Sequence, residues 1–252
     1  MGIYLAAAVA TAVAVWAGLR LLRLWIGSCR THRWVVVFCV LGSPAINVLV
    51  KRPLLLAMLA AAGVGRNSAG WPWWLVAAGL LMVGVTEELV KLLPLLIPSV
   101  RRQLRTDATA VPMSFAIGLG FAVGEIWYLA RSIARTQPQV ASLPVYMLGG
   151  FVSERAATVV IHSALTLIAL SSFRRGPRRL AVGVVAAILA HAAIDFTPAL
   201  FQRGQVSAEL ATIELLVLTI ICSRPFLLER KRVDGHPGQG TWRVLLPPRS
   251  TG

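Results

Sequence analysis

The chain has 252 residues, of which 57% are hydrophobic and only 14% are charged. A soluble domain carries about 25% charged residues, so this chain cannot cover a globular surface with polar side chains. The composition therefore excludes a soluble domain and predicts a protein that crosses a bilayer several times. The formal net charge of +15 does not indicate nucleic-acid binding, because the basic residues gather at the ends of apolar runs.

Apolar runs of roughly 20 residues, long enough for about 30 Å of hydrocarbon, recur along the chain. Helices satisfy their own backbone hydrogen bonds in lipid, and no alternation typical of strands competes with them. We expect an all-α, polytopic transmembrane helix bundle of seven or eight spans. The seven long runs cover residues 3–25, 34–50, 71–100, 111–130, 144–173, 180–200 and 206–222.

An eighth apolar run, at residues 54–65, is too short to span a bilayer alone. Lys51, Arg52 and Pro53 separate it from the run before it. It is therefore either a re-entrant piece or part of a kinked helix with its predecessor. Residues 1–232 form a single membrane domain in this interpretation, with a motif-bearing core at 71–200. The segment 233–252, rich in Gly, Pro and basic residues, is expected to be a flexible cytoplasmic tail.

Basic residues follow every second long run, which is the pattern of cytoplasmic loops. We therefore expect a multi-pass protein of the cell membrane, in contact with anionic lipid headgroups, whose C-terminus is cytoplasmic. Seven spans with the N-terminus outside is the arrangement that this charge pattern favours. The three basic clusters are Arg101, Arg102 and Arg105; Arg174, Arg175, Arg178 and Arg179; and Arg224, Arg230, Lys231 and Arg232.

Ionisable residues inside the predicted spans are the main functional signal. Each costs about 2.5 to 3.5 kcal/mol on insertion scales, so several in one small bundle imply pairing and a purpose. Glu214 has no partner at helical spacing, and we expect it to be structural. The others are Glu87, Glu88, Lys91, Glu125, Glu154, Arg155, His162, His191 and Asp195.

Helical spacing predicts pairs within single helices. Lys91 lies three and four residues after Glu88 and Glu87, so it can neutralise one of these carboxylates. His191 and Asp195 are four apart, so the carboxylate can hold the imidazole in one tautomer. Small residues before the next carboxylate let a neighbouring helix approach closely. These are Gly118, Gly120 and Gly124, which precede Glu125.

The arrangement of these residues on four helices predicts one shared polar site. Carboxylates and imidazoles together can bind and activate a water, with or without a metal ion. A proton-coupled transporter or channel is the alternative of another class, because membrane carboxylates and histidines serve there too. No inverted repeat is visible, and the polar residues form one compact set. A non-catalytic scaffold of the same fold is the third reading.

The same residues carry a family resemblance. Residues 87–91 match an EExxK motif, 121–125 an FxxxE motif, and 191–195 an HxxxD motif. Their order on successive helices resembles the CPBP and PrsW-like superfamily of intramembrane proteases. Glu154 and Arg155, followed by His162, look most like the YhfC branch of putative membrane peptidases. CAAX-type members have histidine and asparagine where this chain has Glu125 and Asp195, and these choices fit the PrsW-like branch.

The resemblance implies hydrolysis of a peptide bond in a membrane-embedded protein or peptide, within a helix bundle around a hydrophilic cavity. The catalytic residues expected from it are Glu87, Glu88, His191 and His162, with a glutamate as the base that activates water. The supporting residues are Lys91, Glu125, Asp195, Glu154 and Arg155. The enzyme is either glutamic-type, without a cofactor, or a metallopeptidase. The expected zinc ligands in the second case are Glu88, Glu125, His162 and His191.

Overall fold

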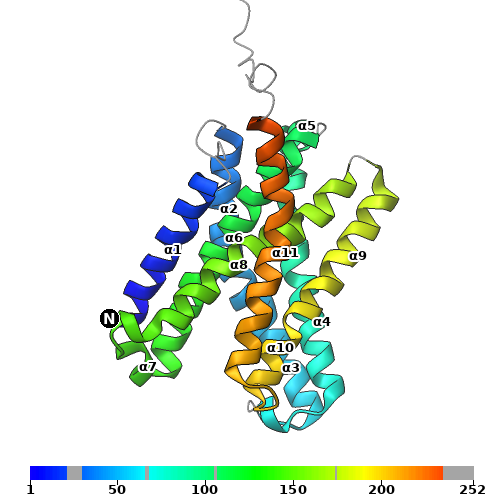
Figure 1. Ribbon diagram of the computed structural model, residues 1–252. Coiled ribbons are helices and arrows are strands. Elements are labelled where there is room, and N and C mark those ends of the chain that lie inside the picture. The colour runs from blue at the N-terminus through cyan, green and yellow to red at the C-terminus, as the bar shows by residue number, and fades with distance from the viewer. Residues whose placement is uncertain (22–29, 66–67, 105–106, 174, 235–252) are drawn as a thin grey trace, which may run out of the picture.

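The computed structural model describes residues 1–21, 30–65, 68–104, 107–173 and 175–234, and helices occupy most of them (Figure 1). Over these ranges there is no strand, so the predicted all-α class is confirmed. Five helices are long and apolar enough to cross a membrane. They cover Thr31–Ala62, Ala110–Thr136, Val145–Phe173, Pro177–Gln202 and Ala208–Leu228.

Two further apolar helices are α1 (Gly2–Leu21) and α4 (Trp73–Leu92), each with 20 residues. They are not among the five, so the predicted count of seven or eight spans is not established. Most of residues 54–65 belong to a helix that continues directly from the run before it, as the second of the two predicted alternatives has it. α2 (Arg30–Ile46) continues through the π-helical segment η1 (Asn47–Lys51) into α3 (Arg52–Ala62), which makes one long apolar run.

The bundle is built around α6 (Asp107–Thr136) and α8 (Gly149–Phe173), which pack against each other. α2 packs on α6, α9 (Pro177–Ile194) on α8, and α4 on α9, while α1 touches both central helices. α10 (Phe196–Gln202) continues α9, and α11 (Ala208–Asp234) covers α8. The N-terminus lies with α7 (Pro138–Ser142) at one end of the bundle, opposite α5 (Pro98–Gln103) and the last turn of α11 (Figure 1).

Glycines on α6 allow the close helix contacts that the sequence predicted. A Cβ added at Gly118 would lie 2.5 Å from the Ser163 Cα on α8, and one at Gly124 would lie 2.4 Å from the Val40 carbonyl oxygen on α2. Side chains at these positions would push the neighbouring helices away. The expectation that small residues bring α6 close to its neighbours is therefore confirmed.

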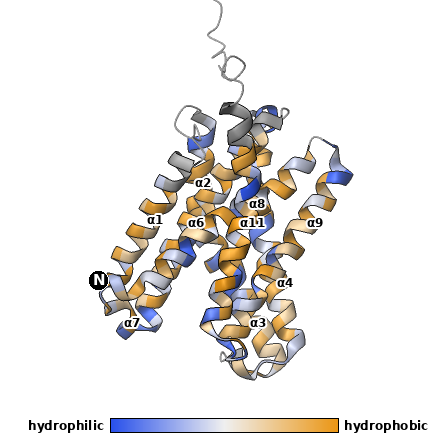
Figure 2. Ribbon diagram, in the orientation of Figure 1, coloured by the Kyte–Doolittle hydropathy of each residue, from blue (hydrophilic) through white to orange (hydrophobic). Residues whose placement is uncertain are grey.

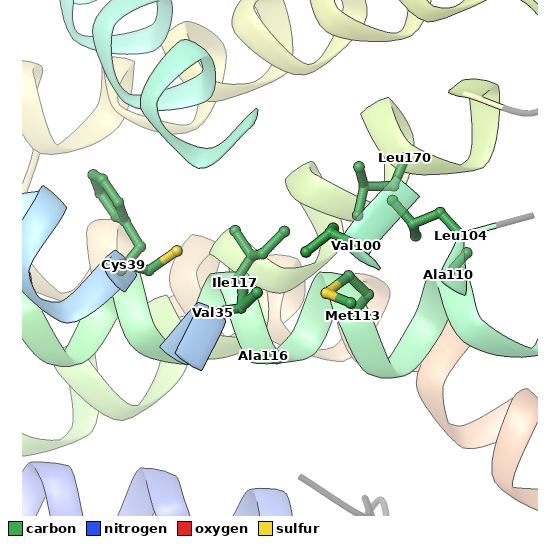
Figure 3. Packing of buried hydrophobic residues seen from close by; sticks show 10 residues of the cluster. Val35, Cys39, Val100, Leu104, Ala110, Met113, Ala116, Ile117 and Leu170 are labelled. Carbon is green, nitrogen blue, oxygen red and sulfur yellow. The ribbon is translucent and has the colours of Figure 1, made fainter. Parts of the chain in front are cut away.

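An apolar cluster packs between the helices near α5 (Figure 3). Its buried members come from α2, α5, α6 and α8 and the residue after α5, and they fill the space between these helices. The members are Val35, Cys39, Val100, Leu104, Ala110, Met113, Ala116, Ile117, Phe121 and Leu170.

Hydrophobic residues make up most of the helices, as Figure 2 shows, and many of their large side chains are exposed. α11 is the clearest case, because only 6% of its apolar window is buried and Leu210, Leu216 and Ile220 are exposed. Such a surface suits lipid. The predicted tail lies outside the described residues except for its first two, Val233 and Asp234, which belong to α11. The side chains of Arg105, Arg174, Arg230, Lys231 and Arg232 also lie outside the described part.

Candidate active site

Ionisable side chains from five helical segments meet in the interior of the bundle. Those of Glu87, Glu88 and Lys91 on α4 are almost completely buried, as are His162 on α8 and His191 on α9. The sequence predicted that these residues share one site, and the structure brings them together. We call the whole set the polar cluster: Lys51, Glu87, Glu88, Lys91, Glu125, Glu154, Arg155, His162, His191 and Asp195.

Lys91 is the most buried member, with an exposed fraction of 0%. Its Nζ donates to Glu88 Oε1 at 2.7 Å and lies 2.8 Å from His162 Nδ1. The ring of Phe121 lies 4.9 Å below the ammonium group. An ammonium has only donors, so Nδ1 of His162 must accept. The other nitrogen, Nε2, then carries the proton and donates to Glu125 Oε2 at 3.1 Å.

His191 donates a hydrogen bond from Nδ1. This atom lies 2.7 Å from Glu88 Oε1, and a carboxylate oxygen only accepts, so Nδ1–H donates. The other nitrogen, Nε2, lies 3.6 Å from Glu87 Oε2 and 3.5 Å from Asp195 Oδ2. When the ring is neutral, Nε2 carries the lone pair. The predicted contact between His191 and Asp195 is present, but the shorter bond that orients the ring comes from Glu88. The rings of His162 and His191 lie 5.6 Å apart.

Glu87 differs from Glu88 in its partners. Its Oε1 accepts from Lys51 Nζ at 2.5 Å. Its Oε2 is buried and accepts no hydrogen bond from any residue that the structure describes. A buried carboxylate oxygen without a donor is costly, so this atom is available for a ligand or a water.

Lys51 is a member of the site that the sequence analysis missed. It was interpreted as part of an interruption between two apolar runs, although its position inside a long apolar stretch was a usable signal. In the structure the apolar stretch Thr31–Ala62 is one continuous helical run, and Lys51, at the end of η1, forms an ion pair with Glu87.

Arg155 connects the buried centre to the more exposed part of the cluster. Its Nη1 lies 3.5 Å from Glu125 Oε2, and its Nη2 donates to Glu154 Oε1. The exposed fraction of the side chain rises from 0% at Lys91 to 17% at Glu125 and 47% at Glu154. Glu154 lies in the first turns of α8, toward α7. The polar cluster is therefore fully buried at Lys91 and least buried at Glu154, which lies toward α7, and at Asp195, with an exposed fraction of 34%.

The family model of PrsW family intramembrane metalloproteases matches residues 30–223, which is most of the chain. The chain belongs to the PrsW family. No curated protein and no solved structure matches it. The PrsW match begins at α2, so it reaches well beyond the predicted motif core of 71–200 and includes Lys51. It makes this protein an intramembrane peptidase and does not favour the transporter.

Three side chains of the polar cluster offer atoms that could bind the metal ion of a metalloprotease. One donor atom each from Glu87, His162 and His191 lie within 4.8 Å of one another. Glu87 Oε2 has no hydrogen-bond partner, and His191 Nε2 presents a lone pair. His191 also donates its other N–H to a carboxylate, as histidine ligands of metals usually do. His162 fits less directly, because Nδ1 accepts from Lys91 and Nε2 carries the proton donated to Glu125, so the ring would have to lose that proton before it could bind a metal.

The charge of the polar cluster also fits a divalent cation. Five carboxylates face three cationic side chains, which leaves a difference of two negative charges when both histidines are neutral. The two least buried carboxylates are Glu154 and Asp195, with exposed fractions of 47% and 34%, so the added charge of a cation can be accommodated but is not required in the buried centre. The metal is therefore favoured by the donor atoms rather than by the charge. The set predicted from sequence contained Glu88 and Glu125 in place of Glu87; the geometry favours Glu87, because Glu88 and Glu125 already have donors.

Proposed function

We propose that this intramembrane peptidase hydrolyses its substrate with a water held between Glu87 and His191. The observation that carries the proposal is the pair formed by Glu87 Oε2 and His191 Nε2. These two atoms lie 3.6 Å apart, Glu87 Oε2 has no hydrogen-bond donor among the described residues, and His191 Nε2 accepts a hydrogen bond when the ring is neutral. A water between them can donate one proton to each acceptor, which orients its oxygen lone pair toward a peptide carbonyl.

The reaction follows from these positions. Glu87 Oε2 takes a proton from the water as its oxygen bonds to the carbonyl carbon of the substrate. The carbonyl oxygen becomes negative and needs donors, which His162 Nε2–H and the guanidinium of Arg155 supply. The C–N bond then breaks, and the proton held by Glu87 passes to the departing amine nitrogen. Glu88 and Lys91 hold the two imidazoles in the tautomers that these roles require.

If a divalent cation such as Zn²⁺ were bound, Glu87, His191 and a deprotonated His162 Nε2 would hold it; it would then polarise the carbonyl in place of the His162 N–H and make the water more acidic. Because Lys51 occupies Oε1 of Glu87, Oε2 is the atom of that residue that either takes the proton or binds the cation. Asp195 Oδ2, 3.5 Å from His191 Nε2, supports the orientation of that ring.

We place seven spans in the bilayer, namely the five long apolar helices together with α1 and α4. A helix of 20 residues is about 30 Å long, which matches the hydrocarbon core. The basic residues Arg101 and Arg102 on α5, with Arg175 after α8, support a cytoplasmic position for that end of the bundle. The N-terminus, α7 and the Glu154 side of the polar cluster then face the outside of the cell membrane, and the C-terminus is cytoplasmic.

The substrate is a membrane-embedded protein or peptide that reaches the polar cluster from the outer half of the bilayer. We also assign the chain to the YhfC branch of the superfamily. That assignment is supported by the sequence Glu154-Arg155 followed by His162, whose side chains belong to the polar cluster and surround Glu125.

The proposal is tested by reconstituting the full-length protein in liposomes with a single-span substrate. The variants Glu87→Gln and His191→Ala are expected to insert normally and to cleave nothing. Glu214→Gln is the matched control, since Glu214 is a membrane carboxylate on α11 outside the polar cluster, and it is expected to cleave like the wild type. Full cleavage by both site variants would refute the mechanism.

The rival transporter function predicts a different result in the same liposomes. Ion or solute flux without any cleavage of the substrate would favour it, whereas cleavage without flux favours the peptidase. A non-catalytic scaffold would show neither activity.

A further inference from the structure

Lys51 reaches the polar cluster through an irregular helical turn. It is the last residue of η1, a five-residue π-helical segment inside an apolar run of 32 residues. A π-turn holds one more residue than an α-turn, so it rotates everything that follows by about 100° around the helix axis. The buried side chain of Asn47 donates to the Ser43 carbonyl oxygen at 2.8 Å and braces the start of the segment.

The contact that results joins two helices far apart in sequence. Lys51 Nζ lies 2.5 Å from Glu87 Oε1, and the exposed fractions of the two side chains are 14% and 2%. The ammonium binds one oxygen of the carboxylate and leaves the other, Oε2, without a donor from the described residues. An ion pair that served packing alone would gain from satisfying both oxygens, because an unsatisfied buried acceptor destabilises the fold.

We infer that Lys51 is a positioning residue for Glu87, which fixes Oε1 so that Oε2 alone faces His191 and the reacting groups. This inference rests on the proposed function, and it adds a helix outside the EExxK, FxxxE and HxxxD motifs to the site. Arg52, the next residue, is exposed on the same helix and is the matched control.

The first experiment measures cleavage kinetics with the purified full-length protein and a single-span substrate. Lys51→Met is expected to lower kcat about 10²-fold with little change in KM, because the carboxylate loses its fixed orientation. Lys51→Arg restores part of kcat, since it keeps a charged donor. Arg52→Met behaves like the wild type. A Lys51→Met variant with wild-type kcat, or with only KM changed, overturns the inference.

The second experiment does not depend on cleavage. Co²⁺ alone is titrated into the purified wild type and variants, and binding is followed by its visible absorption spectrum. Lys51→Met removes a positive charge beside Glu87, so Co²⁺ is expected to bind at least about tenfold more tightly, while Arg52→Met leaves binding unchanged. If Lys51→Met only disturbed the local fold, Co²⁺ would bind more weakly to the variant than to the wild type. Equal or weaker binding in Lys51→Met overturns the inference; if neither protein binds Co²⁺, the kinetic experiment alone decides it.

The two experiments separate this inference from the proposed function. A wild type that cleaves no substrate but binds Co²⁺ less tightly than Lys51→Met refutes the peptidase mechanism and supports the placement of Lys51. A wild type that cleaves, with Lys51→Met equally active, supports the peptidase and refutes the role of Lys51.

Discussion

Replacement of Gly118 by alanine tests whether the spacing of the two central helices sets the geometry of the site. A Cβ at Gly118 would lie 2.4 Å from Ser163 Oγ and 2.5 Å from the Cα and N of the same residue. Two of these three atoms belong to the backbone of α8, so no side-chain rotation can relieve the contact. Ser163 directly follows His162, so the displacement acts at the polar cluster itself.

The magnitude follows from these distances. An ordinary contact needs about 3.4 Å or more, so α6 and α8 must separate by about 1 Å at this point. The hydrogen bond between His162 Nε2 and Glu125 Oε2 joins the same two helices and measures 3.1 Å, so the same separation would break it. We expect a loss of about 1 to 3 kcal/mol of stability from overpacking. Cleavage is expected to fall about 10²-fold, as for a 1 Å misplacement of reacting groups.

The assay compares Gly118→Ala with Gly79→Ala, because a Cβ at Gly79 on α4 meets nothing within 4 Å. Both variants add one methyl group to a membrane helix, so intrinsic helix propensity affects them equally. Thermal unfolding in detergent and cleavage of a co-reconstituted substrate are measured for each. Wild-type unfolding temperature and cleavage in Gly118→Ala would show that the helices separate freely and would refute the reasoning.

Three further outcomes are expected. Ser153 and Ser171 are exposed near the two ends of α8, with Ser153 at the α7 end. A cysteine that replaces Ser153 is labelled by impermeant reagents from outside the membrane, whereas one that replaces Ser171 is labelled only from inside. The reverse labelling pattern would mean that the proposed topology is inverted. A metal chelator abolishes cleavage and added Zn²⁺ restores it; full activity in metal-free protein indicates the glutamic-type mechanism. Lys91→Met lowers stability by about 3 to 5 kcal/mol in thermal unfolding, because Glu88 loses a buried partner; unchanged stability contradicts this.

The sequence identified most members of the polar cluster because charge inside an apolar span is costly wherever it occurs. Glu87, Glu88, Lys91, His162 and His191 could be selected on that ground without knowing how the helices pack. Spacing within one helix also predicted the pairing of Lys91 with a glutamate, which Glu88 fulfils at 2.7 Å.

Contacts between helices could not be predicted in the same way. The bond from His191 to Glu88 joins residues 103 apart, and the contact of Lys91 with His162 joins residues 71 apart. Both depend on how α4, α8 and α9 are rotated about their axes. Helical periodicity says which residues share a face of one helix and says nothing about the residue opposite. Lys51 was missed for a related reason, since its direction depends on a π-turn that no local residue pattern specifies.

The adjacency of the two glutamates gives them different surroundings. Neighbouring residues of an α-helix point about 100° apart, so Glu87 and Glu88 meet different partners from the same turn of α4. Glu88 faces Lys91 and His191, and its Oε1 lies within hydrogen-bond distance of both. Glu87 faces Lys51 and keeps one oxygen without a donor among the described residues. In the proposed mechanism these surroundings divide the work, because Glu88 orients His191 while Glu87 presents its open oxygen to the water.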